Sequence, residues 1–326
     1  MAKASVTVLG GDLRGRYLAE YMESKGHEVT CFGVMAASDT EPFEEGRPLP
    51  GAMPPEKPFL LRNATSLEKA VAASGWILCP MPFSKDRKHL FTLDAAPAID
   101  LEKLKDSLRP GQILVGGGIP EPFSEACARR QVTVMDLMED ETLARANAAL
   151  TAEGLLSMLI AQTPFSLVNR KLLILGFGRC GQEIAWLLSC FSTAVTVCEH
   201  DPERTALAAR CGFLIFGAAQ DAPIPQQGVP IPDAAQSASP ASPLDYDIVI
   251  NTVPAQVLTG QQLSQLPAHC MLFDIASAPF GFQLQAARET GLSLIRCPGI
   301  PGTLMPQTAG ELIAASISER MLSHGV

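Results

Sequence analysis

Short apolar runs alternate with helix-like segments through the first half of the chain. The apolar, β-rich runs lie at residues 5–10, 28–33, 76–80, 112–116 and 132–135. The helix-like segments between them lie at residues 13–25, 66–73, 100–108 and 122–130. Short apolar strands that alternate with helices are typical of a parallel, doubly wound sheet. The pattern therefore predicts an α/β domain over residues 1–147, which we expect to be flavodoxin-like and to lie on the substrate side.

A second alternating unit follows a long helical pattern at residues 140–162. Its strands are expected at residues 171–175, 194–198, 213–216, 247–251, 271–274 and 292–297. Its first two helices are expected at residues 182–191 and 202–211. The fold class predicted for the whole chain is thus α/β, with two doubly wound parallel-sheet domains. The second domain, residues 148–302, is expected to be of the Rossmann type that binds a dinucleotide.

Three further segments complete the pattern. A last helix, predicted at residues 305–321, comes after the sheet is complete, and we expect the terminal segment 303–326 to pack back on the first domain. Residues 39–58 are rich in Pro, Gly and Glu and are predicted to form a surface loop. Residues 217–243 are rich in Ala, Pro, Gln and Ser, without a period, and are predicted to form a mobile surface excursion.

Composition and charge narrow the class of protein. Hydrophobic residues make up 47% of the 326 residues and charged residues 18%, which predicts a large buried core. The net charge of −9 disfavours nucleic acid or an anionic membrane surface as a partner. No apolar run reaches the roughly 18 residues of a membrane-spanning helix. The nine cysteines are spread singly without a C-x-x-C pair, so we expect free thiols in the cytoplasm and no metal site.

The strongest motif is G-x-G-x-x-G at residues 176–181. It directly follows an apolar strand and opens a helix, which is the context that a dinucleotide-binding loop needs. The first glycine makes the tight turn, the second lets the pyrophosphate approach the backbone, and the third lets helix and strand pack closely. The helix N-terminus adds N–H donors and a positive dipole end. The expected cofactor-binding residues of this loop are Gly176, Phe177, Gly178, Arg179, Cys180 and Gly181.

An acidic residue follows at the end of the next predicted strand. Glu199 stands about 20 positions after the glycine loop, where a carboxylate accepts hydrogen bonds from the adenosine ribose. We therefore expect NAD as the cofactor, with NADP as the alternative, because His200 and Arg204 together have the charge to neutralise a 2′-phosphate. The competing interpretation is a glycine-rich turn without a ligand and an incidental surface glutamate.

Two later strand ends carry small polar residues at the edge where open α/β sheets bind ligands. We expect them to contact the ribose or the amide of the nicotinamide. Ordinary strand-to-helix turns favour the same residue types, which is the alternative explanation. The residues are Thr252, Val253, Pro254, Ala276 and Ser277.

The loop after the first strand resembles a phosphate loop but contains an acid. Asp12 places a carboxylate where a phosphate would bind, so a second dinucleotide is not expected, and Asp12 fits a helix N-cap. Arg14 is either an exposed residue of the first helical turn or the partner of a substrate carboxylate. Gly11 is the other expected substrate contact of this loop.

Further candidates lie at the junctions between the two halves. Thr151 and Glu153 are on the connecting helix, where they either cap a helical segment or border the substrate. Gly302 and Thr303 belong to a stiff, proline-flanked loop whose backbone can approach a ligand. Of the five histidines, His200 alone lies in one of these motifs, which counts against a 2-hydroxy-acid dehydrogenase. The catalytic residue is left unassigned, with Glu153 and Asp12 as weak candidates.

Several stretches together resemble the family of dipicolinate synthase A subunits from endospore-forming bacteria: VLGGDLR, NAALTAEGLLSMLIAQT, LLILGFGRCGQEIA, INTVPAQVL, FDIAS and PGIPGTLMPQTAGELIA. The resemblance covers nearly the whole chain. It implies NAD(P)-linked formation of dipicolinate, pyridine-2,6-dicarboxylate, from a dihydrodipicolinate-type intermediate of the lysine pathway during sporulation. It also implies the flavoprotein-like B subunit of dipicolinate synthase as partner, and we expect a homo-oligomer.

The chain departs from this family in two respects. Residues 39–58 and 217–243 look longer than the family pattern, and Glu199-His200 stands where some relatives carry a basic residue suited to a 2′-phosphate. Two other functions stay open. The first is a two-domain NAD(P) dehydrogenase for another amino or keto acid. The second is a non-catalytic dinucleotide-binding subunit whose partner performs the chemistry.

Overall fold

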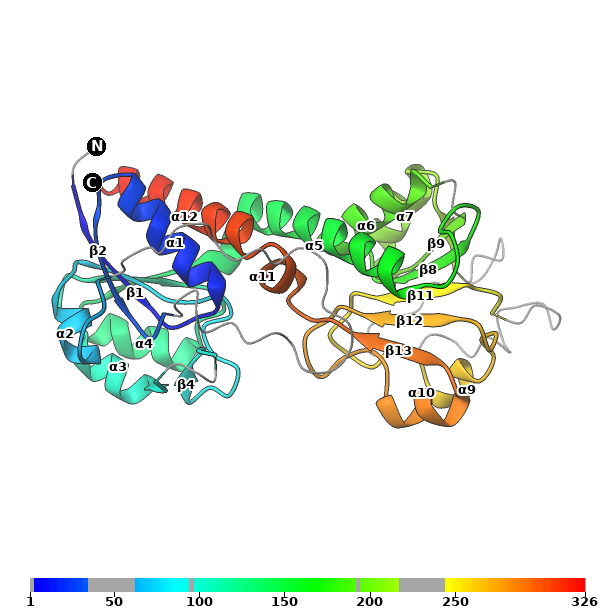
Figure 1. The fold of residues 1–326 in the computed structure, drawn as a ribbon, viewed down its shortest axis with the longest axis horizontal. Coiled ribbons are helices and arrows are strands. Elements are labelled where there is room, and N and C mark those ends of the chain that lie inside the picture. Colours follow the sequence, from blue (N-terminus) through cyan, green and yellow to red (C-terminus); the bar gives the residue numbers. More distant parts are fainter. Residues whose placement is uncertain (1–2, 35–61, 94–96, 192–193, 217–243, 326) are drawn as a thin grey trace. The chain divides into compact units, whose positions relative to one another are not determined.

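The chain forms two compact units in a computed structural model that describes residues 3–34, 62–93, 97–191, 194–216 and 244–325. Unit 1 comprises Met1–Asn147 and Gly302–Val326, and unit 2 comprises Ala148–Pro301 (Figure 1). The segments 39–58 and 217–243, predicted to be surface loops, lie outside the described residues. Each unit has a parallel sheet flanked by helices, so the predicted fold class is confirmed.

Unit 1 contains a five-stranded parallel sheet in the order β2-β1-β3-β6-β7. The strands, in chain order, are β1 (Ser5–Leu9), β2 (Glu28–Phe32), β3 (Trp76–Leu78), β6 (Ile113–Gly116) and β7 (Thr133–Asp136). A separate antiparallel pair is formed by β4 (His89–Leu90) and β5 (Ile99–Asp100). Counted along the five-stranded sheet, the order is the flavodoxin-like 2-1-3-4-5. In such a sheet the ligand binds where the order reverses, here between β1 and β3.

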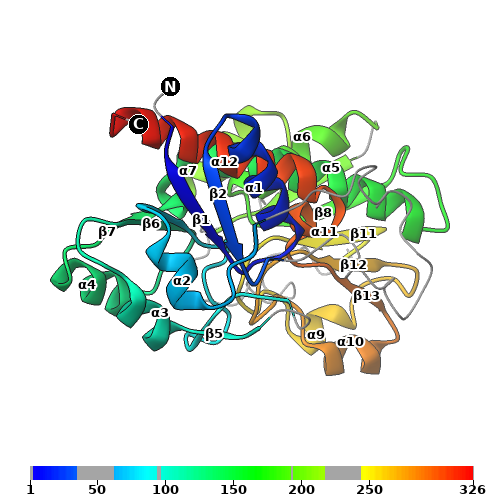
Figure 2. The ribbon, with the colours of Figure 1, turned by 60° about the vertical axis from the view of Figure 1, so that its left-hand side comes forward.

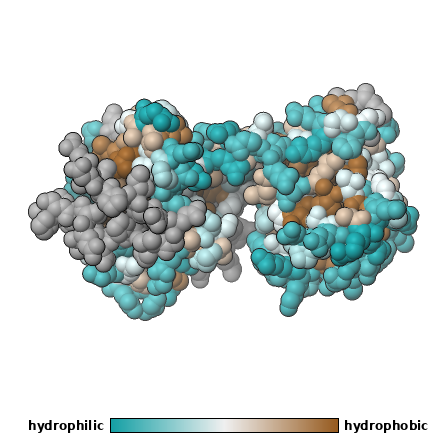
Figure 3. All heavy atoms as spheres, turned by 180° about the vertical axis from the view of Figure 1, so that it is seen from behind, coloured by the Kyte–Doolittle hydropathy of each residue, from teal (hydrophilic) through white to brown (hydrophobic). Residues whose placement is uncertain are grey.

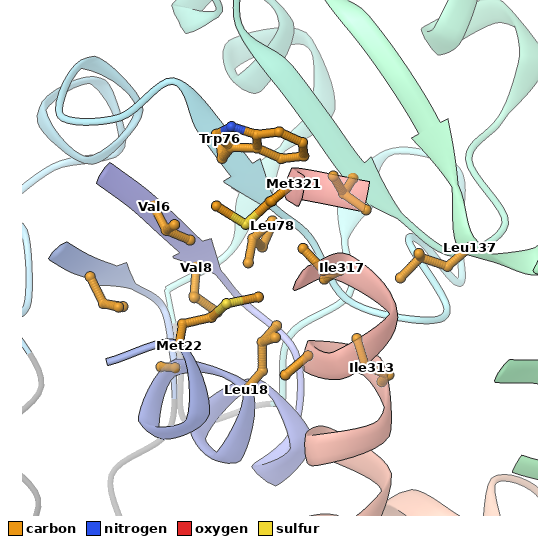
Figure 4. Packing of buried hydrophobic residues seen from close by; sticks show 14 of the residues in the cluster. Val6, Val8, Leu18, Met22, Trp76, Leu78, Leu137, Ile313, Ile317 and Met321 are labelled. Atoms are coloured by element: carbon orange, nitrogen blue, oxygen red, sulfur yellow. The ribbon is translucent and has the colours of Figure 1, made fainter. Parts of the chain in front are cut away.

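Helices cover both faces of this sheet (Figure 2). They are α1 (Leu13–Ser24), α2 (Leu67–Ala72), α3 (Leu101–Ser107), α4 (Glu121–Arg129) and α12 (Pro306–Ser323), with a 3-10 turn at Leu137–Glu139. On one face, Ile313 and Ile317 of α12 and Leu18 of α1 pack with buried residues of β1 and β3 (Figure 4). On the other face, α2, α3 and α4 bury a second apolar cluster around Phe83. The C-terminal helix therefore completes the core of unit 1.

Unit 2 contains a six-stranded parallel sheet in the order β10-β9-β8-β11-β12-β13. The strands are β8 (Lys171–Leu175), β9 (Ala194–Cys198), β10 (Leu214–Ile215), β11 (Ile248–Asn251), β12 (Met271–Asp274) and β13 (Ser293–Arg296). The helices are α6 (Arg179–Ser189), α7 (Pro202–Arg210), α9 (Gly260–Leu263) and α10 (Leu284–Thr290). This 3-2-1-4-5-6 order is that of the dinucleotide-binding fold, in which the two halves of the ligand lie on the two halves of the sheet.

The chain passes between the units twice, in α5 (Glu141–Gln162) and in α11 (Ile300–Leu304). The sequence predicted a stiff loop for the second crossing, and this was wrong: residues 300–304 are helical. Pro301 explains the difference, because proline is well tolerated in the first turn of a helix, where its missing N–H has no intrahelical acceptor. Gly302, expected in the second domain, lies in unit 1.

Seen from behind, hydrophilic residues surround several hydrophobic patches on the surface (Figure 3). Within the described part of the chain, no helix combines the length and the apolar character needed to span a membrane. All nine cysteines are free thiols. The described residues also contain no group of three His, Cys, Asp or Glu side chains placed to hold a metal ion.

Candidate functional site

The glycine loop of unit 2 connects β8 to α6 and is tightly packed at both of its ends. Gly176 has a φ of +92°, and a Cβ there would lie 2.5 Å from Oγ1 of Thr252. A Cβ on Gly181 would lie 2.2 Å from the carbonyl oxygen of Gly176. Both positions therefore require glycine for the loop to close on itself, because any side chain there clashes with atoms of the turn.

The middle glycine has the opposite surroundings. Gly178 caps α6 with an ordinary φ of −71°, and a Cβ there would meet no atom within 4 Å. The first turn of α6 contains no acidic residue. The positive dipole end of this helix therefore has open space beside Gly178, where an anion is favoured. The loop fits a pyrophosphate.

The other residues of the motif have distinct surroundings. Phe177 is buried, and its ring packs on that of Phe213 with 5.8 Å between centroids, so its backbone alone belongs to the site. Arg179 is exposed in the first turn of α6. The Cys180 thiol forms a hydrogen bond with the side chain of Thr151, and burial raises the pKa of this thiol. Cys180 is thus protonated at neutral pH and is unsuited to nucleophilic chemistry.

Glu199 lies just beyond β9, beside the glycine loop, and its carboxylate is almost fully buried. Oε2 accepts a hydrogen bond from the backbone N–H of Phe177 at 2.7 Å. Oε1 accepts from the N–H groups of His200 at 2.8 Å and Asp201 at 3.0 Å. The side chains of His200 and Arg204 contact the same carboxylate at 3.0 and 3.6 Å. Glu199 therefore holds the glycine loop to the start of α7, and a ribose hydroxyl would share it with these partners.

The ends of β11 and β12 carry the other residues that the sequence predicts to contact the cofactor. Thr252 donates its hydroxyl to the carbonyl oxygen of Leu175 at 2.9 Å and packs with Val253 against Gly176. Pro254 and Ser277 are exposed, whereas Ala276 is buried. The expected cofactor contacts thus lie at the carboxyl edge of the sheet, on the side of β8 opposite to Glu199.

A buried polar network, which the sequence did not reveal, fixes this edge. Asp274, fully buried at the end of β12, accepts hydrogen bonds from Asn251 Nδ2 at 2.8 Å, Gly281 N at 2.9 Å and Phe282 N at 3.2 Å. Asn251 also donates to the carbonyl oxygen of Val253. The network ties together two loops that border the cofactor half-site. The only signal in the sequence was an amide, Asn251, and an acid, Asp274, at the ends of neighbouring strands. The backbone N–H groups that bind Asp274 lie seven and eight residues later, where no motif marks them.

Unit 1 has a corresponding loop between β1 and α1. Gly10 and Gly11 have φ values of +58° and +92°, and the Gly11 N–H donates to the carbonyl oxygen of Phe91 at 2.7 Å. Asp12 is the N-cap of α1 and accepts a hydrogen bond from the backbone N–H of Arg14. Together with Pro80 and its neighbours after β3, the loop lines a small hollow. This hollow lies where the strand order of the sheet reverses.

The side chains of Asp12 and Arg14 form a bidentate ion pair. Arg14 Nη2 lies 2.7 Å from Asp12 Oδ2, and Arg14 Nε lies 2.9 Å from Asp12 Oδ1. The Arg14 side chain is 13% exposed, so it is not the exposed first-turn residue that was the alternative expectation. A Cβ on Gly302 would lie 2.9 Å from both Arg14 Nε and Asp12 Oδ2. The structure thus brings Gly302 against this pair, with Thr303 next to it in α11.

The remaining two candidates lie on α5 within unit 2. Thr151 is buried, and its side chain bonds to Cys180 of the glycine loop. Glu153 is exposed. Of the five expected substrate contacts, Gly11, Arg14, Gly302 and Thr303 therefore belong to unit 1, and Thr151 belongs to the cofactor unit.

Comparisons with known proteins point to one family. Residues 5–138 match the family model described as the N-terminal domain of the dipicolinate synthase A subunit. The A subunit of dipicolinate synthase from Bacillus subtilis (strain 168) is 25% identical over 211 residues, which are 64% of this chain. The match spans 65% of that relative, a little under two thirds of its length.

Solved structures show the same fold over almost the full chain. The A subunit of dipicolinate synthase from Bacillus halodurans has a TM-score of 0.71 at 22% identity and covers 97% of both chains. The corresponding Bacillus subtilis structure has a TM-score of 0.73 at 19% identity, covering 99% of this chain and 97% of that one. A transhydrogenase from Sinorhizobium meliloti has a TM-score of 0.57 at 13% identity, with 95% and 90% covered. The resemblance predicted from the sequence is confirmed by the match of residues 5–138 to the N-terminal domain of dipicolinate synthase A subunits and by the similarity to the Bacillus subtilis relative.

Proposed function

We propose that this chain is the NAD-dependent dehydrogenase subunit of a dipicolinate synthase. The observation that carries the proposal is the open space over Gly178 at the positive end of α6, because a pyrophosphate needs close approach to the backbone and is favoured at a helix N-terminus. The names of the family and of the Bacillus subtilis relative support dipicolinate as the product.

The proposed reaction removes a hydride and a proton from a dihydrodipicolinate-type ring and leaves aromatic pyridine-2,6-dicarboxylate. NAD⁺, when bound, accepts the hydride. Aromatisation makes this step strongly downhill, so the protein mainly has to hold the ring about 3–3.5 Å from the hydride acceptor. Asp12 and Glu153 are the candidates for accepting the proton: Asp12 is paired with Arg14, and Glu153 is exposed on α5.

Substrate recognition is assigned to Arg14 together with Gly11, Gly302 and Thr303. The bidentate pair with Asp12 engages the Nε–Nη2 edge of the guanidinium and fixes its orientation. Among the described residues, this pairing leaves the Nη1 edge for a carboxylate of the substrate. A guanidinium held in this way loses little side-chain entropy when it binds a ligand. Its planar set of donors matches the plane of a carboxylate, which favours a planar dicarboxylate as the substrate.

NAD is the proposed cofactor, with NADP as the weaker alternative. Glu199 presents a carboxylate at the end of β9, where a 2′-phosphate would meet like charge. Arg204 is engaged with Glu199 and Asp201, so neutralising a phosphate would draw it away from these two acids. We expect NAD to be preferred by about tenfold, which is roughly 1.4 kcal/mol.

The cellular setting follows from the same family assignment. Relatives that are named as the A subunit of an enzyme imply that a further subunit exists. We propose the flavoprotein-like B subunit of dipicolinate synthase as the partner, with this chain forming a homo-oligomer. Nine free thiols fit the reducing cytoplasm. We place the activity in the sporulation of an endospore-forming cell.

Incubation of the purified chain with the product of the preceding aldolase reaction and NAD⁺ tests the proposal. We expect the ultraviolet spectrum of dipicolinate to appear at a rate proportional to enzyme, with one NADH formed per dipicolinate. Parallel reactions with amino and keto acids test for another dehydrogenase. Dipicolinate formation that requires an added partner, although the chain binds NAD⁺, would instead support the non-catalytic role.

A further inference from the structure

Unit 2 carries an arginine, Arg296, at a position where the dinucleotide-binding fold does not require a positive charge. Arg296 is the last residue of β13, at the carboxyl edge of the sheet, and its register partner on β12 is Asp274. The half of the sheet formed by β11, β12 and β13 lies opposite to Glu199, the adenosine-side acid, so it is the half expected to hold the nicotinamide. Arg296 therefore stands on the reactive side of the bound cofactor.

A strained loop holds the guanidinium in place. Its Cζ lies 4.4 Å from the ring centroid of Phe280, and Nη2 donates a hydrogen bond to the carbonyl oxygen of Phe282. Phe280 has a φ of +69°, a left-handed conformation that is unfavourable for a bulky side chain. The buried carboxylate of Asp274 maintains this loop through the N–H groups of Gly281 and Phe282. The arrangement stacks an aromatic ring on a cation.

The charge of Arg296 is only partly satisfied within unit 2. Among the described residues it forms no ion pair, although Asp274 is its neighbour, because that carboxylate is buried and takes its hydrogen bonds from Asn251 and two backbone N–H groups. Its Nε is buried and has no hydrogen-bond partner in the described structure. Bracing the loop needs one donor for the Phe282 carbonyl, whereas an arginine brings five donors and a full charge. The side chain as a whole is partly exposed.

We propose that Arg296 binds a carboxylate of the substrate beside the nicotinamide. The inference rests on the proposed function and adds to it a specificity-determining residue on the cofactor unit. A guanidinium stacked on a ring and anchored at one nitrogen is oriented for the planar, bidentate recognition of a carboxylate. The ligand class is a six-membered nitrogen ring with a carboxylate next to the nitrogen, and the product dipicolinate is the available probe.

Arg296→Met is the decisive variant, because methionine keeps much of the apolar stem and removes the charge. Calorimetric titrations measure the Kd of NAD⁺, and then the Kd of dipicolinate with NAD⁺ saturating. We expect Arg296→Met to weaken dipicolinate at least thirtyfold and to raise the KM of the substrate, while the Kd of NAD⁺ changes less than threefold. Arg296→Lys keeps the charge without the planar fork and should lose about tenfold. Arg288→Met, an exposed arginine of α10, is the matched control and should change neither constant.

The outcomes separate the inference from the function on which it rests. A parent chain that binds NAD⁺ and forms dipicolinate, with an unchanged dipicolinate Kd in both Arg296 variants, overturns the inference alone. Equal weakening of NAD⁺ and dipicolinate, together with a lower melting temperature, assigns Arg296 to bracing the loop and also overturns it. A parent that binds no dinucleotide overturns the proposed function and this inference together.

Discussion

In both units the first strand of the fold turns into a helix through a loop with the same glycine spacing. The two loops differ in the residue at the helix N-cap. In each loop the first glycine has a positive φ, the third position lies at the N-cap, and the sixth position is a glycine packed on the carbonyl oxygen of the first. The corresponding residues are Gly10, Asp12 and Gly15 in unit 1 and Gly176, Gly178 and Gly181 in unit 2. A Cβ on the last glycine would lie 3.0 Å from that oxygen in unit 1 and 2.2 Å in unit 2.

The two loops differ chiefly in one side chain, that of the N-cap residue. Unit 1 places the carboxylate of Asp12 at the helix N-terminus and pairs it with Arg14, whereas unit 2 leaves open space over Gly178. The same backbone turn thus leaves open space at the helix N-terminus in one unit, where we propose an anion, and holds an oriented ion pair in the other. Glycine spacing therefore defines the turn, and we expect the residue at the N-cap to decide which ligand the turn accepts.

Filling the open position of unit 2 should have the largest effect on ligand binding. Gly178→Val introduces a side chain into space that the folded protein leaves empty, so the fold should persist while the pyrophosphate is excluded. We expect NAD⁺ binding to weaken about a thousandfold or more, roughly 4 kcal/mol. Gly75→Val is the matched control, because a Cβ there also meets no atom within 4 Å. Binding within threefold of the parent would show that the loop does not hold the dinucleotide.

Removing the cation of unit 1 is expected to have the next largest effect. Arg14→Leu should raise the KM of the substrate by about thirtyfold, roughly 2 kcal/mol, because the lost charge-assisted contact is partly buried. The Kd of NAD⁺ should stay the same. Arg62→Leu removes an arginine that is 72% exposed and paired with Glu28, and it should have little effect on either constant. An unchanged KM in Arg14→Leu would return this residue to a purely structural pair with Asp12.

Cofactor choice in unit 2 is expected to depend on Glu199. Glu199→Ala should abolish most of the tenfold preference for NAD, about 1.4 kcal/mol, because the acid that repels a 2′-phosphate is gone. Adding His200→Arg should reverse the preference. Loss of the bonds to Phe177 and His200 will also loosen the loop. Glu199→Gln therefore serves as a milder variant: its one amide oxygen can still accept from His200 and Asp201, whereas the bond from the Phe177 N–H is lost. Steady-state kinetics with both cofactors decide the matter, and a parent that uses NADP better than NAD would contradict the account.

The smallest expected effect is on the stability of unit 1, through the contact between Asp140 and the C-terminal helix. Asp140 accepts a hydrogen bond from Ser316 at 2.6 Å and lies 3.3 Å from Arg320, both on α12, and the Ser316 hydroxyl is the main cause that lowers the pKa of Asp140. A lowered pKa means stability that is present above the unfolded value near 4 and is lost as the pH falls. Asp140→Asn should therefore cost about 1 kcal/mol at pH 7 and progressively less below pH 4.

Denaturant unfolding of the parent and of Asp140→Asn between pH 3 and 7 measures this effect. Asp106→Asn, which changes an exposed acid of the same unit, is the control. NAD⁺ binding to unit 2 should not respond to either substitution. A cost that is independent of pH would show that the carboxylate charge of Asp140 does not stabilise unit 1.

Local pattern was enough to predict much of this molecule. Alternating strands and helices predicted two doubly wound sheets, and the structure confirms that class. The glycine motif located the turn after β8 because its requirement is local: a positive φ at Gly176 and close packing at Gly181. Asp12 as an N-cap is equally local, since its acceptor atoms lie within one turn of α1.

The remaining features depend on contacts between segments that are distant in sequence. No motif in the chain indicates that Gly302 packs on Asp12 and Arg14, because that contact joins residues almost 300 positions apart. The burial of Glu199 by His200 and Arg204 depends on the direction that the chain takes from the end of β9 into α7. Side-chain pairing of this kind is decided by tertiary packing. The period of the hydrophobic pattern indicates only secondary structure and so does not predict it.

The number of dinucleotide molecules that bind per chain shows whether the loop of unit 2, and not that of unit 1, holds the cofactor. Titration calorimetry of NAD⁺ into the parent should give one site per chain, which Gly178→Val removes and Asp12→Asn leaves intact. That result would assign the anion site to the open loop of unit 2 and the oriented cation to unit 1. Two sites per chain, or one site that survives Gly178→Val and is lost on substitution of Asp12, would contradict the account.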